Sequence, residues 1–105
     1  MEVEVLELKK MLKNNEVVLL DVREPYEIKI CNVKGSLFIP MNEIPQKIEQ
    51  LDKETRYAVM CHSGVRSFHV ANYLNSLGYI ALNVVGGIEK WAKDVDKKMN
   101  RYKIV

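Results

Sequence analysis

The residues with the clearest chemical potential lie in a short polar segment that begins with a cysteine. Four residues separate Cys61 from Arg66, and the whole segment consists of Cys61, His62, Ser63, Gly64, Val65, Arg66 and Ser67. The thiolate is the nucleophilic form of cysteine, and a helix N-terminus or a nearby cation lowers a cysteine pKa from about 8.5 toward roughly 3.5 to 7.5. Gly64 allows a sharp turn, and Arg66 supplies a fixed positive charge. We therefore expect Cys61 to be an ionised nucleophile.

The backbone of this segment is expected to bind an anion. Consecutive N–H groups from His62 to Arg66 predict a nest, completed by the positive end of the following helix. Such a nest favours a thiolate and would also stabilise the negative outer sulfur of a persulfide, which permits double displacement through a covalent intermediate. The alternative is that Cys61 is a small buried residue at a strand end, because free cysteines are among the most buried residues. Gly64 and Arg66 favour the catalytic interpretation.

Strands and helices alternate around the cysteine segment. Short apolar runs predict strands over residues 17–20, 37–39, 57–60 and 81–85. Apolar residues at helical spacing predict helices over 5–12, 41–51, 70–77 and 88–99, with Asn42 as a cap and Gly78 as a stop. This alternation predicts a parallel α/β sheet. Ligands bind at the carboxyl ends of the strands in such sheets, where Cys61 falls.

Size and composition bound the possible functions. The 105 residues, 48% of them hydrophobic, predict one domain spanning 1–105. The net charge is only +2, and the basic residues near the C-terminal end fit a solvated helix face, so we expect no nucleic-acid partner. No apolar stretch approaches the roughly 18 residues that a membrane helix needs, so we expect no membrane partner either.

The cysteines and histidines indicate thiol chemistry without a metal. The N-terminal residues lack a secretory signal, so we expect a cytoplasmic, reducing location. Cys31, Cys61, His62 and His69 form no Cys-x-x-Cys or His-x-x-x-His pair. The sequence therefore predicts no structural zinc site, no other metal and no cofactor.

Separated motifs across nearly the whole chain resemble the rhodanese homology family. They are residues 19–27 (LLDVREPYE), 33–36 (VKGS) with Ile39-Pro40, 61–67 (CHSGVRS), and Gly86-Gly87 with Trp91. The resemblance implies a three-layer α/β fold with a mostly parallel five-stranded sheet and helices on both faces. It also implies a single-domain sulfurtransferase in which Cys61 accepts a sulfane sulfur and the loop amides through Arg66 hold the persulfide.

The other motif residues are expected to support the site. Asp21 and Arg23 end a strand, where an ion pair and hydrogen bonds would fix the loop. Gly86-Gly87 and Trp91 fit a turn and the core, without contact to sulfur. His62 is given at most a role in specificity. His69 is expected on the exposed face of its helix.

One departure from the family concerns a second thiol. Many members carry Gly-His where this chain has Cys31-Asn32. Cys31 could therefore approach Cys61 as a resolving cysteine. A disulfide requires a close approach of the two Cα atoms, which the sequence does not provide, so we expect Cys31 to be simply buried or exposed.

Two other functions compete with sulfur transfer. Phosphatases of the Cdc25 type resemble rhodaneses in fold but use longer loops between cysteine and arginine, whereas four residues intervene here, which suits one sulfur atom. A non-catalytic binding module with the same fold is the third hypothesis, disfavoured by Cys61 and Arg66. Thiosulfate, a mercaptopyruvate or a protein persulfide remains open as donor, and a thiol or cyanide as acceptor.

Overall fold

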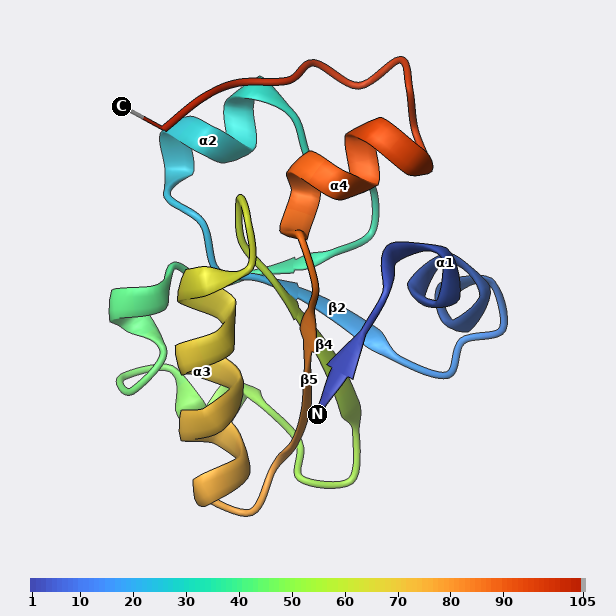
Figure 1. The fold of residues 1–105 in the computed structure, drawn as a ribbon. Helices are drawn as coiled ribbons and strands as arrows, with labels where there is room; N and C mark the ends of the chain where they lie inside the picture. The colour runs from blue at the N-terminus through green and yellow to red at the C-terminus, as the bar shows by residue number, and fades with distance from the viewer. Residues whose placement is uncertain (105) are drawn as a thin grey trace.

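Five parallel strands form the centre of the protein, as the computed structural model, which describes residues 1–104, shows (Figure 1). The strand order is β1-β5-β4-β2-β3. Their bounds are β1 Glu2–Val3, β2 Val18–Asp21, β3 Leu37–Phe38, β4 Arg56–Met60 and β5 Ile80–Val84. The predicted domain runs to Val105, which lies outside the described residues. The carboxyl ends of β2, β4 and β5 meet at one edge, which holds the cysteine loop.

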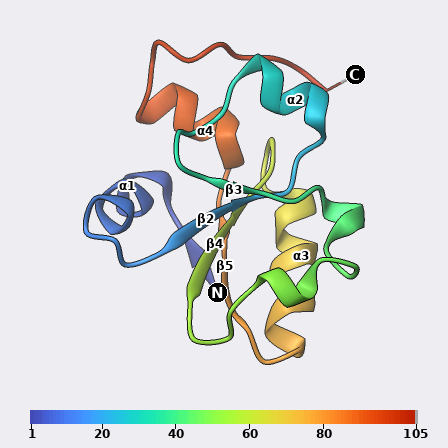
Figure 2. The same cartoon turned by 180° about the vertical axis from the view of Figure 1, so that it is seen from behind.

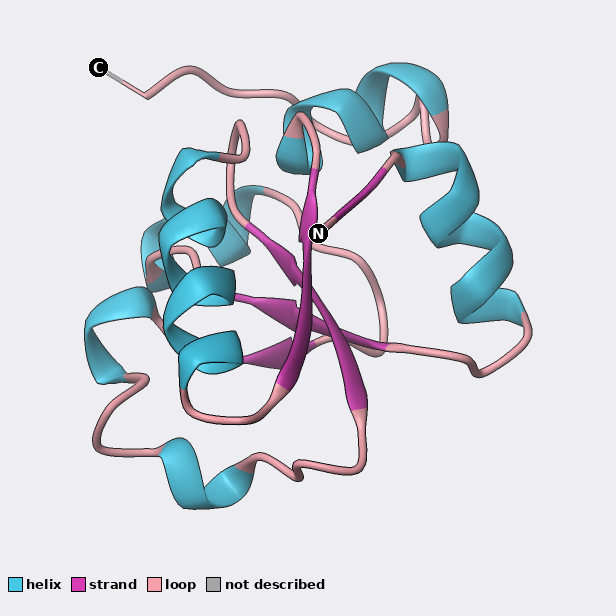
Figure 3. Ribbon diagram, turned by 60° about the horizontal axis from the view of Figure 1, so that its bottom comes forward, coloured by secondary structure: helices cyan, strands magenta, loops and turns pink. Residues whose placement is uncertain are grey.

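Helices cover both faces of this sheet (Figures 2 and 3). The α-helices are α1 Val5–Lys13, α2 Pro25–Ile30, α3 Val65–Ser76 and α4 Gly87–Asp94. Helices α1 and α4 pack on one face, while α3 and two short 3₁₀ helices, η1 Met41–Glu43 and η2 Ile48–Gln50, pack on the other. The three-layer α/β fold with a five-stranded sheet is therefore confirmed, and every strand pair in it is parallel.

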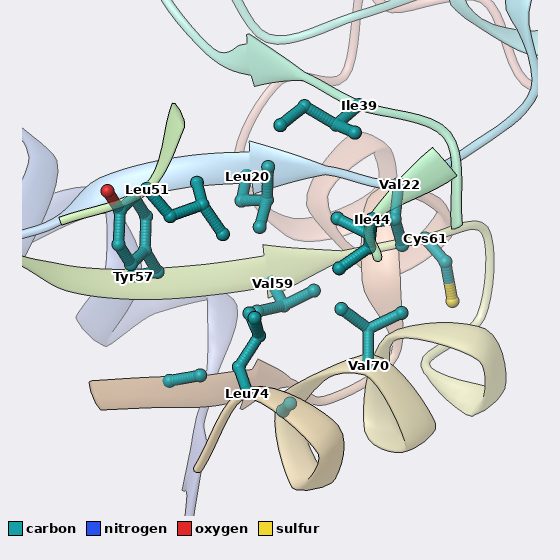
Figure 4. Packing of buried hydrophobic residues seen from close by; sticks show 12 residues of the cluster. Leu20, Val22, Ile39, Ile44, Leu51, Tyr57, Val59, Cys61, Val70 and Leu74 are labelled. Carbon is teal, nitrogen blue, oxygen red and sulfur yellow. The ribbon is translucent and has the colours of Figure 1, made fainter. Parts of the chain in front are cut away.

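Alternation along β4 decides on which face the cysteine lies. Ala58 and Met60 point to the layer of α1 and α4, whereas Val59 and Cys61 point to the layer of α3. Figure 4 shows Cys61 at the end of the row of buried side chains, with its sulfur directed toward the turn that leads into α3. A one-residue shift of register would move the thiol to the opposite face.

The predicted helix over 41–51 is wrong. Two 3₁₀ helices replace it, and Asn42 makes no side-chain cap. Pro45 has no N–H to donate to the Met41 carbonyl, which instead accepts the Ile44 N–H at 3.3 Å in a tighter turn. Ile44 and Leu51 are nevertheless buried against α3, so the apolar pattern correctly marked core residues.

Sequence reasoning missed two elements. Strand β1 has only two residues and adds the fifth strand beside β5. Helix α2 lies between β2 and β3, where the sequence predicted neither a helix nor a strand. Its start is a capping box in which Glu24 and Glu27 exchange side-chain to backbone hydrogen bonds, with Pro25 at the first helical position.

The last helix is shorter than predicted. The N–H groups of Val95 and Asp96 both donate to the Trp91 carbonyl, which ends α4 at Asp94. From there the chain runs without regular structure past α2, in both views of the fold (Figures 1 and 2). Among residues 1–104, no helix is both long enough and apolar enough to cross a membrane.

The glycine turn between β5 and α4 packs directly on the cysteine loop. The Ile88 N–H donates to the Cys61 carbonyl at 2.9 Å, and the Glu89 N–H donates to the His62 carbonyl at 3.0 Å. Gly87 has φ +59°, and a Cβ built on it would lie 2.5 Å from each of these carbonyl oxygens. Only glycine therefore lets α4 begin this close to the loop.

This packing predicts a large effect of Gly87→Ala. The added methyl would displace backbone that cannot yield easily, so we expect a loss of at least about 3 kcal/mol in the free energy of unfolding, measured with urea. Gly35→Ala is the matched control, because Gly35 also has positive φ (+88°) but an added Cβ would meet no atom within 4 Å. Its cost should stay near about 1 kcal/mol of backbone strain. Equal losses for the two variants would contradict the close packing.

Candidate active site

The sulfur of Cys61 lies at the carboxyl end of β4 and accepts a backbone hydrogen bond. The Gly64 N–H donates to Cys61 Sγ at 3.1 Å, and this turn depends on the positive φ of Gly64, +107°. The strand-to-helix loop is residues 61–64, because α3 already begins at Val65. Cys61 is only 1% exposed. The loop amide turns inward to a sulfur that is otherwise surrounded by the core.

Ser67 and Asn83 complete the polar surroundings of the sulfur. The Ser67 hydroxyl oxygen lies 3.3 Å from Cys61 Sγ and 2.6 Å from Asn83 Oδ1. Asn83, on β5, also donates from Nδ2 to the Gly64 carbonyl at 3.2 Å. All three side chains are buried, and the two polar ones find partners in each other. Of the predicted loop residues, Gly64 and Ser67 are the two that contact the sulfur.

Arg66 does not present a free positive charge, in contrast to the expectation. Its guanidinium donates to both carboxylate oxygens of Glu27, at 2.7 and 2.9 Å. Burial of Glu27 opposes its charged form, but hydrogen bonds from Arg66, the Glu24 N–H and Tyr102 lower the pKa of Glu27 to about 2. Hydrogen bonds from Arg66 to Glu27 in turn raise the pKa of Arg66. This pair ties the first turn of α3 to α2.

Asp21 and Arg23 form the buried ion pair that the sequence predicted. Arg23 NH2 lies 2.8 Å from Asp21 Oδ2, and both side chains are inaccessible to solvent. Arg23 also donates to the carbonyls of Glu27, within α2, and of Cys31, which directly follows α2. Burial by itself would lower the pKa of Arg23, but the hydrogen bonds and charge of Asp21 outweigh it and raise that pKa. The end of β2 is thereby fixed to α2.

Tyr102 joins the two ion pairs from the C-terminal segment. Its hydroxyl accepts a hydrogen bond from Arg23 NH1 at 2.9 Å and donates to Glu27 Oε1 at 2.8 Å. Burial raises the pKa of Tyr102, which keeps the hydroxyl neutral. Asp21, Arg23, Glu27, Arg66 and Tyr102 therefore form one continuous set, which we call the charge network.

The remaining residues of the predicted segment contact other parts of the protein or line its surface. His62 Nε2 lies 2.9 Å from the Tyr102 carbonyl, and the two rings pack with centroids 4.5 Å apart. Ser63 and Val65 line an open groove of about 320 Å³ beside the loop, which Gly64 and Asn83 also border. Val65 is 65% exposed. These residues form the outer surface of the site.

The second cysteine lies on the other side of the sheet. Cys31 packs with the layer of α1 and α4, near Arg23, whereas Cys61 belongs to the layer of α3, and both thiols are free. Burial raises the pKa of Cys31. The two cysteines are therefore separated by the sheet, and the predicted exposed position of His69 on α3 is confirmed.

Sequence reasoning missed three residues of the site. Glu27 was quoted only as part of a motif, although its spacing from Glu24 is the signal of a capping box. Asn83 is a polar residue inside an apolar strand, which was a usable signal. Tyr102 offered no signal in the sequence, because it lies several residues beyond the last helix and belongs to no motif. Within residues 1–104, no group of three or more His, Cys, Asp or Glu side chains could hold a metal.

Known proteins resemble this chain in sequence and in fold. Residues 4–94 match the family described as rhodanese-like domain. YtwF of Bacillus subtilis (strain 168) is 36% identical over 98 residues, 92% of this chain and 95% of that protein. A protein named thiosulfate sulfurtransferase GlpE, from Tolumonas auensis, is 38% identical over 82 residues, 77% of each chain. The crystal structure of a rhodanese-related protein from Thermoplasma volcanium has a TM-score of 0.84 at 32% identity and covers 90% of this chain and 92% of that one.

The fold and the site together define a class of protein: a parallel α/β domain with a cysteine in the loop between its central strand and the following helix. The chain belongs to the rhodanese-like domain family, as the match over residues 4–94 and these relatives show.

The low pKa of Glu27 predicts a specific loss of stability in acid. Its folded pKa of about 2 lies below the ordinary 4.5, so the stability that its charge contributes is complete above about pH 4.5 and lost as the pH falls through about 2. The difference corresponds to about 3 kcal/mol. We expect urea unfolding of Glu27→Gln to depend less steeply on pH between 5 and 2 than that of the wild type. Glu49→Gln, at an exposed position, should retain the wild-type slope; parallel curves for all three proteins would refute the assignment.

The position of Tyr102 in the charge network predicts that its hydroxyl stabilises the fold. Tyr102→Phe removes one hydrogen bond to Arg23 and one to Glu27, both charged, so we expect about 2 kcal/mol less stability against urea. Tyr26→Phe is the control, because Tyr26 is 61% exposed and should change stability by less than about 0.5 kcal/mol. If Tyr102→Phe has the same stability against urea as the wild type, the C-terminal segment does not hold the charge network.

Proposed function

We propose that this protein is a sulfurtransferase that moves a sulfane sulfur through a persulfide on Cys61. The Cys61 thiolate attacks the outer sulfur of an anionic donor such as thiosulfate, an S–S bond forms, and sulfite leaves with the electron pair of the broken bond. The acceptor, a thiolate or cyanide, then attacks the outer sulfur of the persulfide. The second step releases the Cys61 thiolate and closes the cycle.

The observation that carries this proposal is the hydrogen bond from the Gly64 N–H to Cys61 Sγ at 3.1 Å. A cysteine that served only as core packing would not require a glycine turn that aims a backbone donor at its sulfur. The loop ends at the N-terminus of α3, a helix of 12 residues whose positive end faces the same region. Both features stabilise negative charge on sulfur, which the thiolate and the persulfide share.

The short loop supports sulfur over phosphate as the transferred group. Four residues lie between Cys61 and Arg66, and Arg66 is engaged by both carboxylate oxygens of Glu27. A phosphatase would need this arginine to bind the phosphate oxygens. We therefore assign Arg66, with Asp21 and Arg23, to holding the loop, and the amides of residues 62–66 to binding the persulfide.

Access to the sulfur is the main physical demand on this mechanism. Because Cys61 is 1% exposed, the loop has to admit the donor, and the groove lined by Ser63, Gly64 and Val65 is the proposed approach. A small anion fits this approach, and a protein persulfide could deliver its sulfur at the same surface. We further propose that residues 1–105 act as one domain without cofactor, nucleic acid or membrane, in the reducing cytoplasm, where Cys61 remains a free thiol.

The proposal predicts a sulfur adduct after incubation with thiosulfate. Intact-protein mass spectrometry should show one added sulfur atom, located on Cys61 by peptide mapping, and subsequent cyanide should yield thiocyanate. Cys61→Ser should abolish the adduct and the transfer, whereas Cys31→Ser should retain both, because Cys31 lies on the opposite face of the sheet. Hydrolysis of an aryl phosphate without an adduct would favour a phosphatase. If the protein carries out neither reaction, a non-catalytic binding module is favoured.

A further inference from the structure

The orientation of the Asn83 amide is fixed by its surroundings. Its Nδ2 donates to the Gly64 carbonyl at 3.2 Å, and its Oδ1 lies 2.6 Å from Ser67 Oγ. A flipped amide would place its oxygen against the Gly64 carbonyl oxygen, which is repulsive. In the observed orientation, Oδ1 can only accept a proton from the Ser67 hydroxyl.

The Ser67 hydroxyl has a single proton and two candidate acceptors. Asn83 Oδ1 is one, and the sulfur of Cys61, 3.3 Å away, is the other. When Cys61 is a thiol, the proton can go to Asn83 while the thiol S–H donates to the Ser67 oxygen. When Cys61 is a thiolate, the sulfur is the stronger acceptor, because a hydrogen bond to a charged group is roughly twice as strong as a neutral one. The Ser67 proton thus has a different acceptor in each of the two states.

We propose that Asn83 is a positioning residue that acts on Cys61 through Ser67. Asn83 holds the Ser67 proton while the sulfur is uncharged, and the hydroxyl rotates to the sulfur when the thiolate forms. The same amide anchors the Gly64 carbonyl, and so fixes the turn from which the Gly64 N–H reaches Cys61 Sγ. Asn83 thereby controls both hydrogen-bond donors of the sulfur without touching it.

This arrangement deepens the proposed function, on which its relevance to catalysis rests. The attacking sulfur is charged, whereas the inner sulfur of a persulfide is not, so the hydroxyl proton returns to Asn83 after the first transfer. Asn83 Oδ1 loses its Ser67 donor while the thiolate is present, and because an unsatisfied buried acceptor costs about 1 to 3 kcal/mol, the amide takes the proton back once the sulfur is neutral. Burial of Ser67 and Asn83 excludes water as a substitute partner.

The charged groups around the sulfur have partners other than the sulfur. Arg66 on α3 is paired with Glu27 on α2, whose pKa of about 2 keeps it ionised in the neutral range. His62, next to Cys61, faces the Tyr102 carbonyl and Glu89 at the start of α4, not the sulfur. The Asp21 and Arg23 pair is closed on itself at the end of β2. A change at Ser67 or Asn83 therefore alters hydrogen bonds to the sulfur without altering the charges near it.

A double-mutant cycle on thiolate formation tests the proposal. The ultraviolet absorbance of the Cys61 thiolate is titrated with pH in Cys31→Ser protein, and the protein with both Cys31→Ser and Cys61→Ser is the blank. Ser67→Ala removes a donor to the thiolate, so the titration midpoint should rise by about half to one pH unit. The shift of the midpoint caused by Asn83→Ala should depend on Ser67. With Ser67 present, the shift should be more negative than in the Ser67→Ala background, and the difference between the two shifts should again be about half to one pH unit. Equal effects of Asn83→Ala in the two backgrounds would overturn the proposal.

Asn75→Ala is the matched control for lost stability. Asn75 also joins α3 to β5 through its amide, with both hydrogen bonds to Ala81 at 2.9 Å, but it lies away from the sulfur. It should lower the melting temperature without moving the titration midpoint. This readout is independent of catalysis, so an absent sulfur adduct with an intact coupling would reject the proposed function alone.

A second measurement needs no change at Asn83. The infrared S–H stretch of Cys61 in Cys31→Ser protein, recorded at a pH below the titration midpoint, should lie at the low frequency of a thiol that donates a hydrogen bond, and should rise in Ser67→Ala. A band already at the position of a free thiol, and unchanged by Ser67→Ala, would show that the thiol does not donate to Ser67 and would overturn the proposal.

Discussion

The burial of charge at the carboxyl edge of the sheet is the constraint on which the site depends. Asp21, Arg23 and Glu27 have no exposed surface, and Arg66 is half-buried against them. An unpaired charge in this position would cost several kcal/mol, so each member is tolerated only with its partner in place. The partners come from β2, α2, α3 and the C-terminal segment. Folding can satisfy them only by bringing these elements together, and the same contacts fix Arg66, at the start of α3, directly after the cysteine loop.

Backbone hydrogen bonds hold the cysteine loop in addition to the charge network. The loop carbonyls of Cys61 and His62 accept the N–H groups of Ile88 and Glu89 in the first turn of α4. This close approach requires a glycine at position 87. The sulfur is then held between a hydrophobic layer below and one amide and one hydroxyl above. A loop fixed at so many points can keep its donors aimed at a developing charge without reorganisation, which is the general basis of electrostatic catalysis.

Sequence patterns predicted the features that depend on local chemistry. The alternation of strands and helices, the place of Cys61 after β4 and the ion pair of Asp21 with Arg23 all follow from residues close in the chain, and the structure has each of them. The prediction of a 41–51 helix was wrong because Pro45 removes one backbone donor. The spacing of apolar residues, on which the prediction rested, does not reflect this effect. The role of Arg66 was misjudged because its partner, Glu27, lies 39 residues away. Asn83 and Tyr102 join the site only through tertiary packing, which no local pattern reports.

A crystal structure of the thiosulfate-treated protein would test the central claim most directly, namely that the loop held by these contacts receives one sulfur atom. The account predicts electron density for a second sulfur bonded to Cys61 Sγ, surrounded by inward-facing amides of residues 62–66, with the charge network unchanged. Density for an unmodified Cys61, or for a sulfur on Cys31 instead, would contradict it.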